Sequence, residues 1–232
     1  MKGRISSFES LGTVDGPGVR NVVFMQGCPL RCACCHNPET WDVNGGKETD
    51  SIELSERILR YGNYFGPEGG VTVSGGEPLL QASFVAELFS ILKKAGINTA
   101  LDTSGCLWNE DVERLLSVTD LVLLDHKFAT EEDYVKYTKG SLKRTEDFLS
   151  ELQKRNIPTW IRRVIIPGIN DDEASTRQLL ELEKRFSCIK KTEPLPFRKL
   201  CLSKYEFLGI DFPLKDVREA DEGDIAKVFG FY

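Results

Sequence analysis

The chain has 232 residues, of which 30 are Lys or Arg and 36 are Asp or Glu, so its formal net charge is −6. An acidic balance without a basic stripe argues against a nucleic-acid-binding surface. No apolar run approaches the roughly 20 residues of a membrane-spanning helix, and the first residues lack the apolar region of a signal peptide. This length allows one sizeable hydrophobic core, and we expect a single domain over residues 1–232.

Short β-branched runs alternate along the chain with longer stretches of helical periodicity. The expected strands are residues 21–25, 70–73, 98–101, 121–124, 159–166 and a weaker 189–195. The expected helices are residues 51–61, 81–95, 110–117, 145–155 and 172–185. Such alternation predicts an α/β fold with a parallel sheet, and periodicity alone does not separate a barrel from a doubly wound sheet.

Four of the seven cysteines fall within eight positions, at Cys28, Cys32, Cys34 and Cys35. Thiolates select zinc, copper(I) or iron–sulfur clusters, but a zinc ribbon needs a second ligand pair that this chain lacks. The spacing Cys28-x3-Cys32-x2-Cys35 can hold three corners of a four-iron cluster and leaves one iron open. Cys34 is a poor fourth ligand, because adjacent side chains tend to diverge in extended backbone. Cysteines at metal spacing also indicate a reducing, cytoplasmic compartment.

This three-cysteine loop resembles the signature of radical S-adenosylmethionine (SAM) enzymes. The string from Cys34 to Trp41 and the turn-rich segment from Gly12 to Arg20 together resemble one branch of them, the activating enzymes of glycyl radical enzymes. The resemblance implies a partial (β/α)6 TIM-like barrel, the radical SAM fold. It also implies that Cys28, Cys32 and Cys35 hold a 4Fe–4S cluster whose open iron is chelated by the amino and carboxylate groups of SAM.

Further residues match positions of the family that contact SAM, and they lie on loops after expected strands, where a barrel carries its chemistry. The segment Gly75-Gly76-Glu77 resembles the element that holds the SAM amino group. Asp102 and Thr103 resemble an element near the SAM carboxylate and a monovalent cation. The other cofactor-binding residues that the resemblance implies are Cys34, Cys35, His36, Asn37, Asp125, His126, Lys127, Arg162 and Arg198.

Four of the chain's residues differ from the family pattern. Cys34 stands where an aromatic residue is usual, His126 where an apolar residue is common, Arg198 in place of a histidine, and Cys201 in place of a glycine. On the expected strand 159–166, Arg162 and its neighbour Arg163 face opposite ways, so at most one of them points into a barrel.

The resemblance implies reductive cleavage of SAM to methionine and a 5′-deoxyadenosyl radical, which takes hydrogen from a glycine of a partner enzyme. That chemistry needs no protein acid, base or nucleophile, and no catalytic residue is assigned. Asp15 and Arg20 are expected beside the groove for the partner's glycine loop. No cysteine-rich insert lies between Trp41 and Val71, which favours pyruvate formate-lyase as the partner. A flavodoxin or ferredoxin is expected as electron donor, and the protein is expected to be a monomer.

Two alternatives stay open at this stage. One is a radical SAM enzyme that acts on a different glycyl radical enzyme or on a small molecule. The other is a non-catalytic module that binds a metal or carries electrons. Anaerobic reconstitution separates this last possibility, because a 4Fe–4S protein is brown and a zinc protein is colourless.

Overall fold

The structure is a computed structural model that describes residues 1–230, and the chain divides into two compact units. Unit 1 comprises residues 1–29 and 40–123, and unit 2 comprises residues 30–39 and the chain from residue 124 onward. The division passes through the cysteine loop, since Cys28 belongs to unit 1 whereas Cys32 and Cys35 belong to unit 2. A single domain over residues 1–232 stays a prediction.

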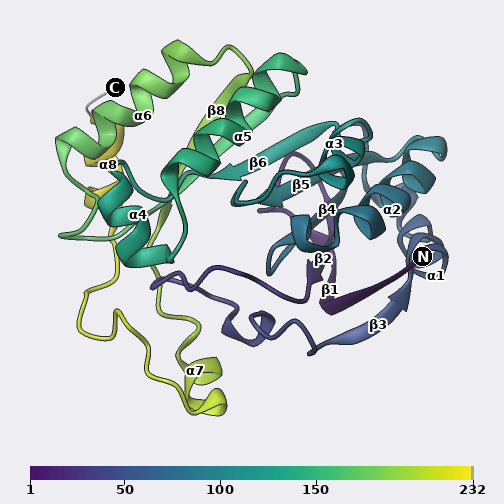
Figure 1. Cartoon of the computed structure of the whole chain (residues 1–232), viewed down its shortest axis with the longest axis horizontal. Coiled ribbons are helices and arrows are strands. Elements are labelled where there is room, and N and C mark those ends of the chain that lie inside the picture. The colour runs from purple at the N-terminus through teal and green to yellow at the C-terminus, as the bar shows by residue number, and fades with distance from the viewer. Residues whose placement is uncertain (231–232) are drawn as a thin grey trace. The chain divides into compact units, whose positions relative to one another are not determined.

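Unit 1 is built on a sheet with the strand order β3-β1-β2-β4-β5 (Figure 1). The parallel strands β2, β4 and β5 form its centre, and β1 pairs antiparallel with both β2 and β3. The strands are β1 (Lys2–Gly12), β2 (Arg20–Met25), β3 (Lys47–Asp50), β4 (Gly70–Gly75) and β5 (Asn98–Thr103). The next strand, β6 (Leu121–Asp125), begins in unit 1 and ends in unit 2.

Three helices pack in series in unit 1, where α1 (Ser51–Leu59) contacts α2 (Ala82–Lys94) and α2 contacts α3 (Glu110–Leu116). The central helix α2 buries Phe84, Leu88 and Leu92 at helical spacing, which is the face that periodicity predicts. Short 3-10 helices lie at Pro38–Thr40, Gly62–Tyr64 and Pro78–Gln81.

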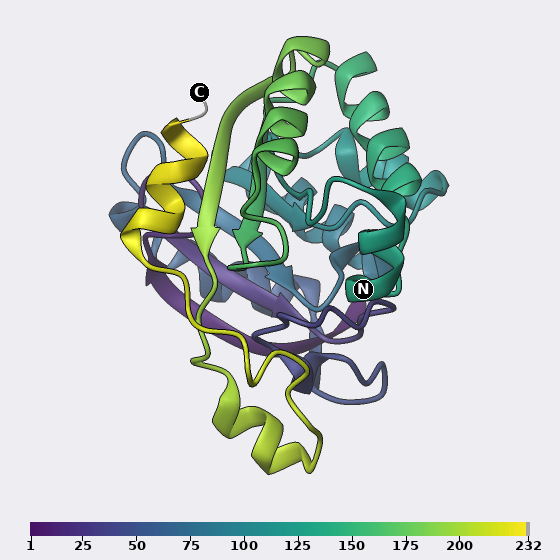
Figure 2. The same cartoon turned by 90° about the vertical axis from the view of Figure 1, so that its left-hand side faces the viewer.

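Unit 2 contains a parallel strand pair, β7 (Thr159–Ile165) and β8 (Ile189–Pro196). Its helices are α4 (Glu131–Thr138), α5 (Leu142–Lys154), α6 (Glu173–Arg185), α7 (Leu202–Leu208) and α8 (Glu222–Gly230). Helix α8 lies beside β8, as Figure 2 shows. Asp172 caps the N-terminus of α6, because its carboxylate accepts a hydrogen bond from the Ser175 amide at 3.0 Å.

All the expected strands and helices are present, with ends that differ by at most three residues. The sequence did not predict β1, β3, α4, α7 and α8. Strand β1 buries only Gly3, Ile5 and Gly12, so its sequence carries almost no hydrophobic alternation. None of the helices in residues 1–230 is both long and apolar enough to cross a membrane.

Candidate cluster and cofactor site

The cysteine loop begins directly after β2, and its base is closed by main-chain hydrogen bonds in unit 1. The amide of Gly27 donates to the Thr40 carbonyl at 2.7 Å, and that of Cys28 donates to the Trp41 carbonyl at 3.4 Å. Cys28 itself is half-buried. Cys106 is buried after β5, where desolvation raises its pKa to about 12 with added contributions from Glu77 and Cys28. Cys106 is therefore a neutral thiol near Cys28 rather than a thiolate.

The glycine pair after β4 packs against the chain that leads into Cys28. Gly76 donates its amide to the Met25 carbonyl at 2.9 Å, and Glu77 donates to the Gly27 carbonyl at 2.8 Å. A Cβ atom on Gly76 would lie 2.3 Å from the Gly27 oxygen, and one on Gly75 would lie 2.5 Å from the Met25 nitrogen. The two glycines therefore allow a close approach of one main-chain segment to another.

Replacement of Gly76 by alanine should consequently disturb the cysteine loop. We expect Gly76→Ala to lower the free energy of unfolding by about 1–3 kcal/mol, because the new methyl group must push the Gly27 carbonyl away. We also expect less iron to bind after reconstitution, since Cys28 follows the displaced residue. Urea unfolding and iron analysis measure the two effects. Gly62→Ala is the control, because a Cβ atom there meets only Ile97 Cδ1, at 3.9 Å. Equal losses in the two variants would contradict the packing role of Gly76.

Glu77 is 1% exposed and joins the loop after β4 to the loop after β5. Its carboxylate accepts hydrogen bonds from the Thr103 hydroxyl at 2.5 Å, from the Ser104 amide at 3.0 Å and from the Ser104 hydroxyl. The side chains of Glu77 and Thr103 are therefore occupied by each other and by Ser104. A ligand at the Gly75-Gly76-Glu77 segment would contact its main chain. Asp102 is half-buried and accepts a hydrogen bond from the Ser74 hydroxyl at 2.7 Å.

Arg20 lies fully buried at the start of β2, with 0% exposure. Its guanidinium donates to the Thr72 hydroxyl at 2.8 Å, to the Val71 carbonyl at 2.8 Å and to the Asn98 side-chain oxygen at 2.8 Å. It also reaches the carbonyls of Pro17, Glu68 and Asn98. Arg20 therefore braces the Gly12–Arg20 segment against β4 and β5, and its side chain has no surface for a partner.

Asp15, by contrast, is half-exposed on the same segment. Its carbonyl accepts a hydrogen bond of 2.6 Å from the Thr72 hydroxyl, which in turn accepts from Arg20. The Arg20–Thr72 contact thus fixes the backbone from which the Asp15 carboxylate projects.

In unit 2 the tip of the cysteine loop is docked on the C-terminal end of α4. The Arg31 amide donates to the Thr138 carbonyl at 2.8 Å, and the Ala33 amide donates to the Tyr137 carbonyl at 2.7 Å. Cys35 closes a turn on Cys32, with a bond of 3.1 Å from its amide to the Cys32 carbonyl. These bonds hold the turn that carries both cysteines.

Helix α7 holds the chain that follows Cys35. The Tyr205 hydroxyl donates to the Cys35 carbonyl at 3.2 Å. The Lys204 ammonium donates to the side-chain oxygen of Asn37 at 2.8 Å and to Glu39 Oε1 at 2.5 Å. Sequence reasoning missed Lys204 and Tyr205. Lys204 and Asn37 lie 167 positions apart, and no local pattern relates them.

Two more of the predicted cofactor residues meet through the main chain. The ring nitrogen Nε2 of His36 lies 2.8 Å from the Arg198 carbonyl oxygen. The Arg198 guanidinium instead donates to the Ala220 carbonyl at 2.8 Å, so it is directed at the chain just before α8. The histidine that the family has at this position is thus replaced by a residue whose side chain holds the C-terminal segment.

Asp125 and Lys127 form an ion pair after β6, with 2.6 Å between the ammonium nitrogen and Oδ2. Burial opposes the charge of Lys127, but the charge of Asp125 outweighs burial and holds the pKa of Lys127 well above its usual value. Burial also raises the pKa of Cys34 to about 11. The ion pair therefore stands beside the cysteine turn as a fixed positive and negative group.

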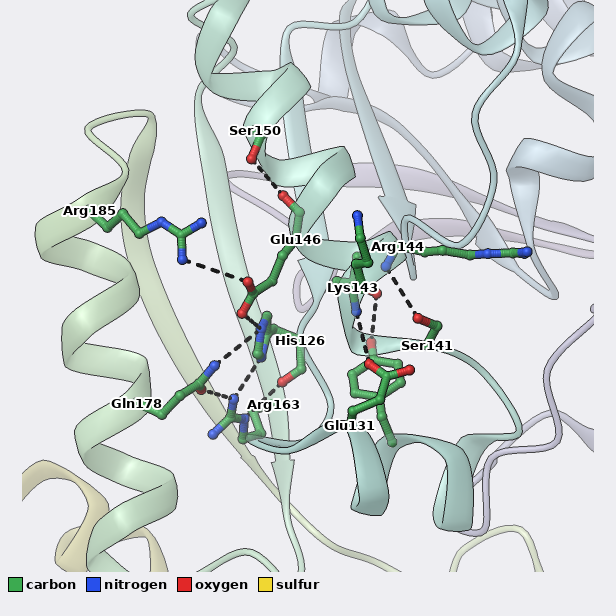
Figure 3. A network of polar contacts seen from close by, with 12 residues as sticks. His126, Glu131, Ser141, Lys143, Arg144, Glu146, Ser150, Arg163, Gln178 and Arg185 are labelled. Carbon is green, nitrogen blue, oxygen red and sulfur yellow. Dashed lines mark hydrogen bonds and ion pairs between the residues drawn. The ribbon is translucent and has the colours of Figure 1, made fainter.

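His126 lies between these two residues in sequence but takes part in a different network (Figure 3). It has 0% exposure, and its Nδ1 lies 2.7 Å from an Arg163 guanidinium nitrogen. Its Nε2 lies 3.5 Å from Gln178 Nε2 and 3.9 Å from Glu146 Oε1, on helices α6 and α5. The structure thus places His126 against side chains of α5 and α6, which we call the helix layer, and the cofactor contact that the resemblance implied for it is not supported by this geometry.

The burial of His126 predicts a pH dependence of stability. Burial lowers the pKa of His126 to about 4 from 6.5, because the charged ring would lose its hydration beside Arg163. The folded state then stays unprotonated while the unfolded chain gains a proton below pH 6.5, so stability falls as the pH drops from 6.5 towards 4. The full loss is about 3 kcal/mol. His126→Asn keeps an acceptor for Arg163 and does not titrate, so it should lose less stability over this range. The free energy of unfolding is measured with urea at several pH values. An equal loss of stability in the two proteins between pH 6.5 and 4 would contradict the assignment.

The neighbouring arginines of β7 have separate sets of partners, as the alternation of a strand predicts. Arg163 is 1% exposed and donates to the Ser175 carbonyl at 2.9 Å and to the Gln178 side-chain oxygen at 2.7 Å, both on α6. Arg162 pairs instead with Glu193 on β8, at 3.0 Å. The Arg163 side chain thus contacts the His126 ring, whereas the Arg162 side chain pairs with a strand residue.

The donor set of the cysteine loop suits an iron–sulfur cluster. None of the seven cysteines forms a disulfide, and the four in the loop are half-buried whereas the other three are buried. Accessible thiols near a lysine are the environment in which thiolate ligands form. No three His, Cys, Asp or Glu side chains within residues 1–230 already stand together as a metal site.

Comparison with known proteins identifies the family. The family model described as a 4Fe-4S single cluster domain matches residues 14–145. The pyruvate formate-lyase-activating enzyme of Clostridium pasteurianum is 43% identical, over 96% of this chain and 93% of that enzyme. The pyruvate formate-lyase 1-activating enzyme of Escherichia coli K12 is 42% identical, over 98% of this chain and 94% of that enzyme.

A solved structure agrees at the level of the fold. SuiB of Streptococcus suis, crystallised with S-adenosylmethionine, superposes with a TM-score of 0.65 over 88% of this chain and 44% of SuiB, at 15% identity. This likeness confirms the prediction of the α/β radical SAM fold, a partial (β/α)6 barrel. With a cluster-binding family model and relatives above 40% identity along nearly its whole length, the chain belongs to the pyruvate formate-lyase activating enzymes, a branch of the radical SAM enzymes that use a 4Fe–4S cluster and SAM.

Proposed function

We propose that this protein activates pyruvate formate-lyase by placing a radical on one glycine of that enzyme. The observation that carries the proposal is the identity of 42–43% with pyruvate formate-lyase activating enzymes over 96–98% of the chain. The match extends over 93–94% of those enzymes, and the Cys28-x3-Cys32-x2-Cys35 loop is present to supply the cysteine chemistry.

In this proposal Cys28, Cys32 and Cys35 hold the cluster, and Cys34 does not. The bound 4Fe–4S cluster supplies one electron that cleaves SAM into methionine and a 5′-deoxyadenosyl radical, which takes hydrogen from the partner's glycine. The protein's part is to hold the three thiolates at fixed positions. Three hydrogen bonds support this role, because each holds the loop at a ligand cysteine or at the residue beside one. They join Gly27 to Thr40, Ala33 to Tyr137, and Tyr205 to Cys35.

The chain's other residues would bind and orient SAM. The main chain of Gly75–Glu77 receives the amino group, and Asp102 lies near the carboxylate with a monovalent cation. Lys127, held in its charged form by Asp125, suits a carboxylate or ribose oxygen. Arg162 provides a planar guanidinium for the carboxylate, and it is positioned by Glu193. Cys34 would lie beside the adenine, and Cys35, His36 and Asn37 would also contact SAM.

Partner recognition is proposed for the exposed part of the Gly12–Arg20 segment. Asp15 would contact the glycine loop of the partner, and Arg20 would act only by holding the backbone of Asp15 through Thr72. A flavodoxin or ferredoxin would deliver the electron, and the protein would act as a cytoplasmic monomer.

Electron paramagnetic resonance tests the proposal directly. The reconstituted protein is incubated without oxygen with pyruvate formate-lyase, SAM and dithionite. We expect a glycyl radical signal that disappears when SAM is left out or when the partner's radical-bearing glycine is replaced by alanine. SAM cleavage without any radical on pyruvate formate-lyase, together with a radical on another glycyl radical enzyme, would assign a different partner.

A further inference from the structure

Three successive carbonyl groups, from the last residue of β6 onward, are each held by a buried side chain from a different part of unit 2. The Asp125 carbonyl accepts from the Tyr134 hydroxyl at 3.3 Å, and the His126 carbonyl accepts from Arg163 Nε at 2.8 Å. The Lys127 carbonyl accepts from Asn170 Nδ2 at 3.3 Å. We call Tyr134, Arg163 and Asn170 the carbonyl clamp.

The three donor side chains are buried, which restricts their movement. Tyr134 and Arg163 are 1% exposed and Asn170 is 2% exposed. Burial raises the pKa of Tyr134 to about 12, so its hydroxyl stays protonated and can donate. Asn170 also bridges the end of β7, since it donates to the Val164 carbonyl at 2.9 Å and accepts from the Ile166 amide at 2.7 Å. Each clamp residue is therefore itself held by packing or by further hydrogen bonds.

Arg163 connects the clamp to the helix layer. Besides the His126 carbonyl and ring, it contacts the Ser175 carbonyl and Gln178 of α6, and Figure 3 shows how the His126 ring, Arg163 and Gln178 converge. The His126 amide donates to the Arg162 carbonyl at 2.9 Å, so both main-chain groups of His126 are used. The segment has no freedom to rotate about its backbone while these bonds persist.

The fixed segment presents two charged side chains. With the His126 side chain held in the helix layer, its neighbours Asp125 and Lys127 form their ion pair beside Cys32 and Cys34. A shift of the main chain at Lys127 would displace the Cα atom from which the lysine side chain extends, so the bonds to these carbonyls help to set the position of the ammonium group.

We propose that Tyr134, Arg163 and Asn170 are positioning residues that hold the Asp125–Lys127 ion pair in the orientation that binds SAM. They touch neither the cluster nor SAM themselves and act through three main-chain carbonyls. The inference rests on the proposed contact of Lys127 with SAM.

The test uses variants that remove one donor at a time from the cluster-loaded protein. Tyr134→Phe removes a hydroxyl and keeps the ring, which packs edge-on against Phe128. Asn170→Ser replaces the side-chain amide that reaches the Lys127 carbonyl with a shorter hydroxyl group. We expect each variant to weaken SAM binding threefold to tenfold by calorimetry, the loss that corresponds to one hydrogen bond. We also expect faster deuterium exchange in residues 125–128 of the SAM-free protein. The visible spectrum of the cluster should not change.

Gln153→Ala is the matched control. Gln153 accepts a hydrogen bond of 2.9 Å from the Cys188 amide, so its loss also removes a side-chain bond to buried backbone, but its partners are Ser187 and Cys188 rather than residues 125–127. It should lower the melting temperature without changing SAM affinity or the exchange of residues 125–128. If Tyr134→Phe and Asn170→Ser behave like Gln153→Ala, the clamp is only structural and the inference is overturned.

Lys127→Met separates this inference from the proposed function. If Lys127→Met weakens SAM binding while the clamp variants bind normally, the proposed cofactor contact holds and the clamp inference fails. If Lys127→Met binds SAM as tightly as the unaltered protein, the contact itself is wrong, and the clamp loses the role assigned to it. Weaker binding in all three variants, with faster exchange only in the clamp variants, supports the inference.

Discussion

Replacing Cys28, Cys32 or Cys35 by alanine is expected to abolish the cluster, and with it all SAM cleavage. Two thiolates cannot hold three corners of a four-iron cube, so each single substitution should have the full effect. Iron and sulfide analysis, the brown absorption of thiolate–iron charge transfer, and methionine release after reduction with dithionite measure the outcome. We expect all three to fall to the background of protein without iron.

Cys34→Ala is the control for this series, because it removes a thiol from the same turn. It should assemble the cluster normally, since Cys34 is assigned no iron. A Cys34→Ala protein without iron, or a Cys35→Ala protein with a complete cluster, would require a different ligand set.

Arg20→Met should produce the second large effect, on stability rather than on chemistry. The substitution keeps the aliphatic part of the side chain but leaves the Val71 carbonyl, the Asn98 side-chain oxygen and four other acceptors without their donor. Burial lowers the pKa of Arg20 to about 10, so holding the charge has a cost that methionine would recover. Orphaned buried acceptors cost about 1–3 kcal/mol each, and we expect a net loss of at least about 3 kcal/mol.

Urea unfolding of the cluster-free protein under reducing conditions gives this number. Arg57→Met serves as the control, because Arg57 is an exposed arginine of α1 whose guanidinium lies 3.8 Å from the centre of the Phe8 ring. An exposed cation–π contact is worth about 0.5–1 kcal/mol. Similar losses for Arg20→Met and Arg57→Met would mean that the buried network does not stabilise unit 1.

Arg20 also has a consequence for partner recognition. If it acts only by holding Asp15, then Asp15→Asn should impair radical transfer to the partner without the stability loss of Arg20→Met. The sequence groups Asp15 and Arg20 as one partner-binding pair. In this proposal Asp15 contacts the partner, and Arg20 only stabilises the backbone of Asp15.

Much of the fold was predictable from the sequence, because its central strands and amphipathic helices carry strong periodic signals. Residues 21–25 and 98–101 read as strands, and they form β2 and β5 with small changes at the ends. Strand β1 and helix α7 were not predictable. Strand β1 is held by pairing with β2 and β3, and that pairing does not require apolar alternation. Helix α7 is only seven residues long.

The cofactors of the site were also predictable, for a different reason. The cysteine spacing and the residues after each strand belong to short motifs, which identify a cluster and its cofactor without any knowledge of contacts. What such motifs cannot indicate is the direction of a side chain. His126 and Arg20 lie inside motifs, yet the first is turned into the helix layer and the second is buried beneath β4 and β5.

The sequence by itself therefore determined the chemistry: three cysteines at a spacing that suits a cluster, and loops whose residues suit SAM. Only the tertiary structure decided which residues hold that chemistry in place. Tyr134, Arg163 and Asn170 come from α4, from β7 and from the loop after β7, and each donates to a main-chain carbonyl. Every residue has the same carbonyl group, so the sequence does not indicate which carbonyl accepts such a bond. The donor is recognised only when the folded chain brings the two groups together.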